Sequence, residues 1–308
     1  MAKKYDVIVI GAGPGGLTAG LYASRANLSV LILDRGIYGG QMNNTAEVEN
    51  YPGFKSILGP DLAEKMYQGA IQFGAEYAYG SVEKVEVNGD LKQVITDNET
   101  YEAPVVIIAT GSQYRKLGVE GEAEYAGRGV SYCAVCDGAF FKDQPLAVIG
   151  GGDSAVEEGV YLSKLASNVN IIHRRDQLRA QKILQERAFA NDKIDFTWDT
   201  VVTKINGDGQ KVTSVSTHNK KTGEDGELKV NGVFIYVGVI PLTEPFKTLG
   251  ITDEQGWINT DELMRTSLPG VYAIGDVRAK ELRQITTAVG DGSIAGQQAF
   301  NYIESLKD

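Results

Sequence analysis

The only two thiols of this 308-residue chain are Cys133 and Cys136, and Asp137 follows them directly. Two cysteines at this spacing can close a small disulfide ring, and a helix N-terminus lowers the pKa of one of them. They are also half of a structural zinc site, but zinc takes about four ligands. Only His173 and His218 remain as further histidine ligands. The pair is therefore interpreted as a redox dithiol, with Asp137 either a proton donor or a turn-capping residue.

A glycine-rich turn follows the first apolar run of the chain. The run Val7–Ile10 leads into Gly11–Gly16 (GAGPGG), and a helical stretch continues to about Asn27. In a G-x-G-x-x-G turn the first glycine permits the tight bend, the second lets the backbone approach a pyrophosphate, and the third seats the helix on the strand. Asp34 ends the next strand, where a carboxylate can hold ribose hydroxyls. The segment is interpreted as a dinucleotide cradle rather than a purely structural turn.

The same unit returns later in the chain with a different ending. It consists of the run Leu146–Ile149, the turn Gly150–Ala155 (GGGDSA), a helical stretch to about Ala166 and the strand Val169–Ile172. The place of Asp34 is taken by His173, Arg174 and Arg175, with Arg179 close behind. Guanidinium groups pair with a 2′-phosphate that a carboxylate would repel, so this cradle is predicted to prefer NADPH to NADH. A solvated helix start is the alternative interpretation of these arginines.

Gly275 and Asp276 favour a flavin in the first cradle. The pair follows the apolar run Val271–Ile274, and an aspartate at such a strand end can bond a ribityl hydroxyl. A helix is predicted from about Thr286, and its positive end can stabilise an anionic reduced isoalloxazine. Two cradles with opposite ribose chemistry therefore predict FAD in the first and NADPH in the second.

Composition narrows the class of protein. Forty acidic against thirty basic side chains leave a formal net charge of −10, which argues against a general binder of nucleic acid or anionic membranes. The hydrophobic fraction of 43% is ordinary for a folded chain, whereas 37 glycines are unusually many. No apolar run approaches the roughly 18 residues that span a bilayer. Because Val7–Ile10 is too short for a signal-peptide core, we expect a cytoplasmic protein.

Strands alternating with helical stretches predict an α/β fold with two Rossmann-like dinucleotide-binding domains. The predicted boundaries are a polar, glycine-rich segment, Lys116–Glu124, and a proline-containing turn, Ile240–Pro245. The NADPH-binding domain would cover residues 117–243 and carry the dithiol, inserted into a discontinuous FAD-binding domain of residues 1–116 and 244–308.

Six motifs occur in order along the chain: Gly11–Gly16, Gly39-Gly40-Gln41, Cys133–Gly138 (CAVCDG), Gly150–Ala155, His173-Arg174-Arg175 and Gly275-Asp276. Their order and spacing resemble the low-molecular-weight bacterial thioredoxin reductases, within the class II pyridine nucleotide-disulfide oxidoreductases. The resemblance covers essentially the whole chain. It implies a homodimer with one FAD per subunit that reduces thioredoxin at the expense of NADPH.

The resemblance also implies roles for single residues. Cys136 would be the flavin-proximal sulfur, Cys133 the thiol that attacks the thioredoxin disulfide, and Asp137 the acid–base residue. The implied FAD-binding residues are Gly11, Gly13, Pro14, Gly15, Gly16, Asp34, Gly40, Gln41, Thr45, Asn50, Gly111, Gly275, Asp276, Arg283, Gln284 and Ile285. The implied NADPH-binding residues are Gly150, Gly152, Asp153, Ser154, Ala155, His173, Arg174, Arg175 and Arg179. Thioredoxin would dock through Arg128 and the aromatic pair Phe140-Phe141, although Ala139 stands where some members carry a first aromatic.

Other interpretations remain open at this stage. A flavin disulfide reductase for another thioredoxin-like or low-molecular-weight disulfide would use the same motifs. A dithiol oxidase would keep the cysteines without needing the nicotinamide cradle, against which His173, Arg174 and Arg175 argue. A redox sensor or flavin-storage module is the non-enzymatic alternative. Turnover with thioredoxin distinguishes the enzyme from the sensor.

Overall fold

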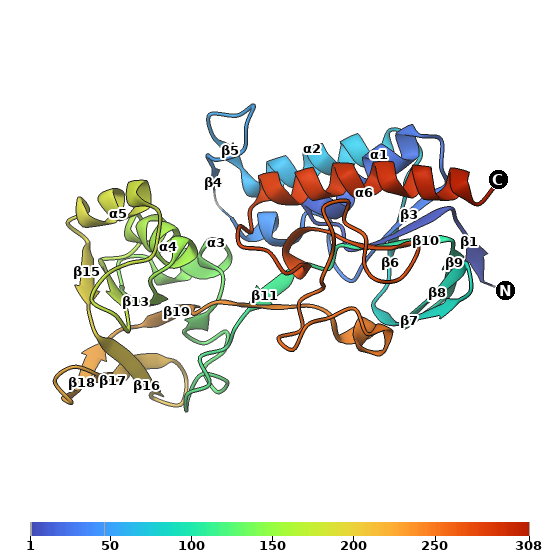
Figure 1. The fold of residues 1–308 in the computed structure, drawn as a ribbon. Coiled ribbons are helices and arrows are strands. Elements are labelled where there is room, and N and C mark those ends of the chain that lie inside the picture. The colour runs from blue at the N-terminus through green and yellow to red at the C-terminus, as the bar shows by residue number, and fades with distance from the viewer. Residues whose placement is uncertain (1, 46, 308) are drawn as a thin grey trace. The chain divides into compact units, whose positions relative to one another are not determined.

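A computed structural model describes residues 2–45 and 47–307 (Figure 1). The chain forms two compact units: unit 1 is Met1–Gln113 with Ile240–Asp308, and unit 2 is Tyr114–Val239. The sequence placed the two boundaries three and four residues further along, at 116/117 and 243/244. Two short strands, β11 (Ser112–Tyr114) and β20 (Val239–Pro241), pair with each other where the chain passes between the units.

Unit 1 is built on a five-stranded sheet of order β21-β10-β2-β3-β6, in which neighbouring strands pair in parallel. Its strands are β2 (Val7–Ile10), β3 (Val30–Asp34), β6 (Glu76–Tyr79), β10 (Val105–Ile108) and β21 (Val271–Ala273). Strands β2 and β10 are apolar at every position because both faces of the sheet are covered. Val7 and Val9 pack in one core cluster, and Ile8 and Ile10 pack in another.

Helices cover one face of this sheet, and a second sheet covers the other. The helices are α1 (Pro14–Arg25), α2 (Gly59–Ile71) and α6 (Ile285–Ser305). The second sheet has the order β1-β9-β8-β7, with β1 (Lys3–Lys4), β7 (Val82–Asn88), β8 (Leu91–Thr96) and β9 (Thr100–Ala103). A short hairpin joins β4 (Glu47–Val48) and β5 (Ile57–Leu58). The C-terminal helix α6, red in Figure 1, runs alongside α1.

Glycines, which have no side chain, let α1 and α6 approach each other closely. A Cβ added to Gly292 would lie 2.4 Å from the carbonyl oxygen of Gly15, and one added to Gly296 would lie 2.6 Å from Cβ of Tyr22. Gly15 itself lies in the first turn of α1, within the predicted cradle. The last helix of the chain therefore supports the start of the first.

Unit 2 repeats the strand–helix–strand unit in a five-stranded sheet of order β12-β19-β13-β14-β15, again with parallel pairings. Its strands are β12 (Val130–Ser131), β13 (Pro145–Gly150), β14 (Asn168–Ile172), β15 (Ile194–Thr197) and β19 (Gly232–Tyr236). Its helices are α3 (Ala134–Asp137), α4 (Asp153–Ser163) and α5 (Lys182–Phe189). An antiparallel sheet adds β16 (Thr200–Gly207), β17 (Val212–Asn219) and β18 (Asp225–Lys229).

The predicted α/β fold with two Rossmann-like units is confirmed. Element ends differ from the sequence prediction by a few residues. Helix α1 ends at Arg25 rather than Asn27, because Asn27 takes a left-handed φ of 64°. Helix α4 ends at Ser163, and α6 begins at Ile285. Within the described ranges, no helix combines the length and apolarity needed to cross a membrane.

A fragment of residues 114–239 is expected to fold alone, because unit 2 holds two core clusters of its own. A fragment of residues 1–113 lacks β21 and α6, so α1 loses its closest helical neighbour and should not fold. Circular dichroism and urea unfolding check both. A cooperative transition of the 1–113 fragment would contradict the dependence of α1 on α6.

Candidate functional site

Cys133 and Cys136 are joined by a disulfide, with an S–S distance of 2.07 Å and a Cα–Cα distance of 5.4 Å. Cys133 caps the one-turn helix α3, and its Sγ accepts a hydrogen bond from the Cys136 N–H at 3.1 Å. Cys136 is the more exposed of the two residues. The predicted disulfide between the two cysteines is confirmed, and their redox role stays a prediction.

Asp137 ends α3 and precedes the short 3-10 helix Gly138–Phe141. Its side chain makes no capping hydrogen bond to that helix. The carboxyl group is therefore not used as a cap, which was the alternative to a proton-transferring role. Phe140 follows three residues later with 78% of its surface exposed.

The segment before the cysteines is anchored by a buried carboxylate that sequence reasoning missed. Glu122 accepts hydrogen bonds from the backbone N–H groups of Leu117 and Gly118 and from the Tyr132 hydroxyl. Burial alone would raise the pKa of Glu122, but these hydrogen bonds bring it below its usual value. The residue that directly precedes Cys133 is thus tied to the start of unit 2.

The first cradle depends on glycines that leave no room for a Cβ. A Cβ added to Gly11 (φ +111°) would lie 2.3 Å from the carbonyl oxygen of Ala109, and one added to Gly16 would lie 1.8 Å from that of Gly11. A Cβ added to Gly13 would meet nothing within 4 Å. Gly13 is also the N-cap of α1 and contributes no side-chain cap. Open space therefore faces the amide groups of the first helical turn, as a pyrophosphate requires.

Asp34 lies at the edge of this cradle. Its carboxylate accepts hydrogen bonds from Ala12 N–H at 2.7 Å and Gly36 N–H at 2.9 Å. Gly39 N–H donates to the Ala12 carbonyl, which brings the following loop against the turn. Gly40 continues that loop, and a Cβ added to it would lie 3.3 Å from Cα of Gly13.

Further predicted FAD-binding residues gather from distant parts of unit 1. Gln41 donates its side-chain amide to the carbonyl of Ser112 at 3.2 Å, and the Thr45 hydroxyl donates to the Gln41 carbonyl at 3.3 Å. Asn50 donates to the Gln284 side chain at 3.0 Å, although the two residues are far apart in sequence. Gln284 in turn forms a capping box with Thr287 at the start of α6.

The Gly275-Asp276 turn is held by a buried charge cluster that the sequence did not reveal. Asp291 of α6 accepts the Gly275 N–H at 2.9 Å and forms ion pairs with Arg278 at 2.9 Å and Lys280 at 2.8 Å. Burial raises the pKa of Asp276, and the positive charge of Lys280 partly opposes that shift. Asp291 could have been noticed in the sequence, because it is a charged residue between Gly290 and Gly292 in the helix that packs on α1.

Arg283 is fixed beside this turn. Its guanidinium lies 3.8 Å from the ring centroid of Trp257 and donates to the carbonyl oxygens of Asp276 and Arg278. Gly111, which follows β10, has a φ of +70° and a carbonyl that accepts the Leu242 N–H. The remaining predicted FAD residues, Pro14, Gly15 and Ile285, begin the helices α1 and α6.

The second cradle repeats the geometry of the first. A Cβ added to Gly150 would lie 2.4 Å from the carbonyl oxygen of Tyr236, whereas one added to Gly152 would meet nothing within 4 Å. Asp153 begins α4, and its carboxylate accepts both the backbone and side-chain N–H groups of Gln181. Ser154 is exposed in the same first turn, and Ala155 stands where the first cradle has Gly16.

His173 and the three arginines occupy different places. Arg174, Arg175 and Arg179 are exposed, while His173 is only 4% exposed. The His173 ring lies beneath the turn, because a Cβ added to Gly151 would fall 2.4 Å from its Nδ1. Burial, followed by the three nearby guanidinium charges, lowers the pKa of His173 and keeps it neutral. In the described part of the chain its buried Nε2 has no hydrogen-bond partner.

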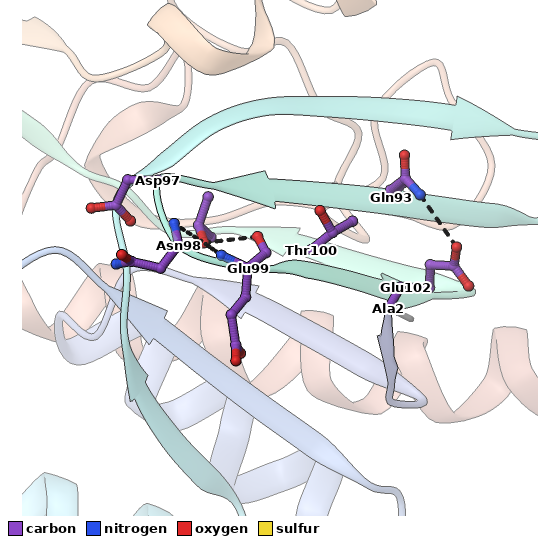
Figure 2. Close-up of a pocket in the computed structure, with 8 residues that line it drawn as sticks. Ala2, Gln93, Asp97, Asn98, Glu99, Thr100 and Glu102 are labelled. Atoms are coloured by element: carbon purple, nitrogen blue, oxygen red, sulfur yellow. Dashed lines mark hydrogen bonds between the residues drawn. The ribbon is translucent and has the colours of Figure 1, made fainter.

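These observations fit the cofactors predicted from the sequence. Each cradle offers an uncapped helix start with open space at the second glycine. The first has a carboxylate at its ribose edge, and the second has arginines around a neutral histidine. A separate polar hollow, shown in Figure 2, lies on the second sheet of unit 1 and is lined by Ala2, Gln93, Thr96, Asp97, Asn98, Glu99, Thr100 and Glu102. It contains none of the predicted site residues.

The fold and the two cradles define a nucleotide-dependent disulfide oxidoreductase. The chain belongs to the pyridine nucleotide-disulphide oxidoreductase family, whose sequence profile matches residues 5–292. Its cofactors are FAD and NADPH, as the sequence predicted.

Named relatives cover nearly the whole chain. A thioredoxin reductase of Listeria innocua is 62% identical over 306 residues, which is 99% of this chain and 96% of the relative. A thioredoxin reductase of Bacillus subtilis is 58% identical over 306 residues, 99% of this chain and 97% of the relative. The crystal structure of Lactococcus lactis thioredoxin reductase superposes with a TM-score of 0.97 at 54% identity, covering 98% of this chain and 99% of that one. The resemblance inferred from the six motifs is confirmed.

Glu158 of α4 provides a test of the electrostatics around the dithiol. Burial, and then the charge of Glu157, raise the pKa of Glu158 from 4.5 to about 8. Between these two values the folded state keeps a proton that the unfolded state has lost, so this group lowers stability as the pH rises from about 4.5 to about 8. Glu158→Gln should therefore stabilise the protein at pH 8 to 9, by on the order of 3 kcal/mol, and have little effect near pH 5.

Urea unfolding of wild type and Glu158→Gln at both pH values measures this difference. Glu186→Gln, an exposed glutamate of α5, is the matched control and should change stability little at either pH. A stabilisation by Glu158→Gln that is equal at pH 5 and pH 9 would show that the Glu158 proton is not its cause.

Proposed function

We propose that this chain is a thioredoxin reductase that carries reducing equivalents from NADPH through FAD and the Cys133–Cys136 disulfide to oxidised thioredoxin. The observation that carries the proposal is the formed disulfide in the same compact unit as the arginine-edged cradle. The relatives named thioredoxin reductase support it, since they match nearly the full length of the chain. The net reaction consumes NADPH and a proton and converts the thioredoxin disulfide to two thiols.

FAD is assigned to unit 1. The amide groups at the start of α1 would bind its pyrophosphate, and Asp34 would hold the adenosine ribose. Both oxygens of Asp34 already accept a backbone N–H, Oδ2 from Ala12 and Oδ1 from Gly36, which orients the carboxylate. Each oxygen has a second lone pair with which it would accept from a ribose hydroxyl. Asp276 would bind the ribityl chain, with Asp291 fixing the backbone of that turn. Gln41, Thr45, Asn50 and Gln284 would surround the flavin, and Gly111, Arg283 and Ile285 would complete its site.

NADPH is assigned to unit 2. Gly150, Gly152 and the first turn of α4, Asp153 to Ala155, would hold its pyrophosphate. Arg174, Arg175 and Arg179 would pair with the 2′-phosphate, because they are exposed and gather around one edge of the cradle. His173 would support the pyrophosphate-binding turn, because its ring packs beneath Gly151. Its neutral state avoids a further buried cation beside three guanidinium groups.

When bound, the two cofactors supply hydride transfer from the nicotinamide to the flavin and electron-pair delivery to the disulfide. Cys136 is assigned as the sulfur that receives this pair, and Cys133 as the thiol that attacks thioredoxin. The Cys136 N–H would stabilise a Cys133 thiolate, because it already donates to that sulfur. Asp137 would take up and return the proton that each thiol gains and loses, since its carboxyl makes no cap.

Thioredoxin is assigned to the surface around Phe140, which exposes a large aromatic side chain just after the dithiol. Arg128 is the second assigned docking residue, and hydrogen bonds to the carbonyls of Glu124 and Gly209 hold it in place. We further propose a homodimer that works in the cytoplasm without a membrane or nucleic-acid partner. Sedimentation at several protein concentrations tests the dimer.

Cys136→Ser is expected to retain bound FAD, to be bleached by NADPH without oxygen, and to lose more than about 99% of its turnover with thioredoxin. The reason is that the electron pair has no disulfide to enter. NADPH consumption with thioredoxin as acceptor measures it, with wild type as the reference and glutathione disulfide as a low-molecular-weight acceptor. Retained turnover in the variant would remove the dithiol from the reaction, and stoichiometric rather than repeated reduction by wild type would mark a sensor.

Replacing Arg174 and Arg175 by alanine should raise the KM for NADPH at least about tenfold and change the KM for NADH little. Only NADPH carries the 2′-phosphate with which the guanidinium groups pair. Lys220 and Lys221, two exposed cations in the β17–β18 turn, give a control double variant with the same loss of charge. If the control raises the KM for NADPH as much, general charge rather than phosphate contact is the cause.

A further inference from the structure

Tyr236 is a buried residue for which the reaction outlined above has no role. It ends β19, and only 6% of its surface is exposed. Its ring meets that of Tyr114 edge-on, with 5.4 Å between centroids. Burial, and then the nearby carboxyl of Glu158, raise the pKa of its phenol, and Asp137 adds to the shift. The hydroxyl group is therefore protonated at any pH at which the protein works.

The Tyr236 hydroxyl holds the start of the dithiol helix. It accepts a hydrogen bond from the Ala134 N–H at 3.1 Å, in a fully buried position. Ala134 stands between the two cysteines, is 1% exposed, and is the first residue of α3. A buried backbone N–H without an acceptor is costly, so this contact fixes the place where the helix turn begins.

The backbone of the same residue belongs to the nucleotide cradle. Tyr236 pairs in register with Gly150, and its carbonyl oxygen is the atom that leaves no space for a Cβ on that glycine. One residue is thus joined to the cradle through its main chain and to the dithiol turn through its side chain. A change confined to the hydroxyl should leave the cradle intact and loosen only the turn.

We propose that Tyr236 is a positioning residue for the dithiol: its hydroxyl anchors Ala134 so that the Cys136 N–H stays directed at Cys133 Sγ. This inference rests on the proposed function for its catalytic consequence. A hydrogen bond from N–H to sulfur favours the thiolate over the thiol, so it lowers the pKa of Cys133 in the reduced protein. Without the anchor the turn loosens, the hydrogen bond weakens, and the Cys133 pKa rises.

The test compares Tyr236→Phe with Tyr161→Phe, each combined with Cys136→Ser. Serine keeps the backbone N–H that faces Cys133 and leaves Cys133 as the only thiol. Tyr161 lies on α4 and also faces the helix that follows Cys136, since a Cβ added to Gly138 would lie 3.7 Å from its ring. No hydrogen bond of its hydroxyl is found among the described residues. Removing this hydroxyl is therefore the same chemical change in the same neighbourhood without the anchor.

The readout is the rate of iodoacetamide alkylation of Cys133 as a function of pH. Tyr236→Phe should move the midpoint upward by about half to one pH unit, and Tyr161→Phe should not move it. In the two-cysteine protein, Tyr236→Phe should lower kcat with thioredoxin by about three- to tenfold and leave the KM for NADPH unchanged. Equal midpoints in the two variants, or equal shifts, would overturn the inference.

Two further outcomes are separable. If wild type reduces no thioredoxin but the alkylation midpoints differ as stated, the proposed function fails and the role of Tyr236 at Cys133 stands. If Tyr236→Phe does not fold, amide exchange in wild type decides instead. The Ala134 amide should then be protected at least about a hundredfold relative to an unstructured peptide. An unprotected Ala134 amide would overturn the inference.

Discussion

Two strand-to-helix turns, in which the backbone lies against neighbouring carbonyl groups, position both cradles and the helices that follow them. At Gly11 and Gly150 the chain leaves a buried strand with a positive φ and lies against the carbonyl oxygen of a neighbouring strand. No side chain fits there, so each helix starts directly above the sheet with its amide groups uncovered. The second glycine of each G-x-G motif, Gly13 or Gly152, is different because the place of its absent side chain is empty space. Steric exclusion shapes each turn, and open space beside it receives the ligand.

Both units apply the same construction, and their main chemical difference lies at the edge where the ribose would bind. In unit 1 a carboxylate is tied to the turn by hydrogen bonds, whereas in unit 2 a neutral, buried histidine supports the turn and three exposed arginines surround it. The overall charge of −10 makes this positive edge a local feature, since the chain as a whole repels anions. In the function proposed here, a few side chains on a shared backbone would therefore set the specificity for one nucleotide over the other.

The dithiol is integrated into the second unit rather than placed on a free loop. Its helix has only one turn, so it cannot order itself by propensity and depends on tertiary contacts. Tyr236 anchors its first amide, and Glu122 holds Tyr132, the residue that precedes Cys133. The carboxyl of Glu158, neutral at pH 7, lies beside the same tyrosine. A redox couple that must open and close without losing its geometry is supported from several directions.

The α/β class, the two cradles, the cysteine pair and the cofactors could be predicted from residue types alone, because each depends on local residues at fixed spacing. Strand, glycine turn and helix are consecutive in the chain, and Cys133 and Cys136 lie within one turn. The distant groups that complete the sites could not be predicted in this way, because the packing of the folded chain brings them together. Asn50 and Gln284, Gly275 and Asp291, and Ala134 and Tyr236 meet through hydrogen bonds between segments far apart in sequence. In the sequence His173 looks like a fourth cationic residue beside the arginines. In the structure it is buried beneath Gly151, and this burial depends on how the sheet and the turn pack.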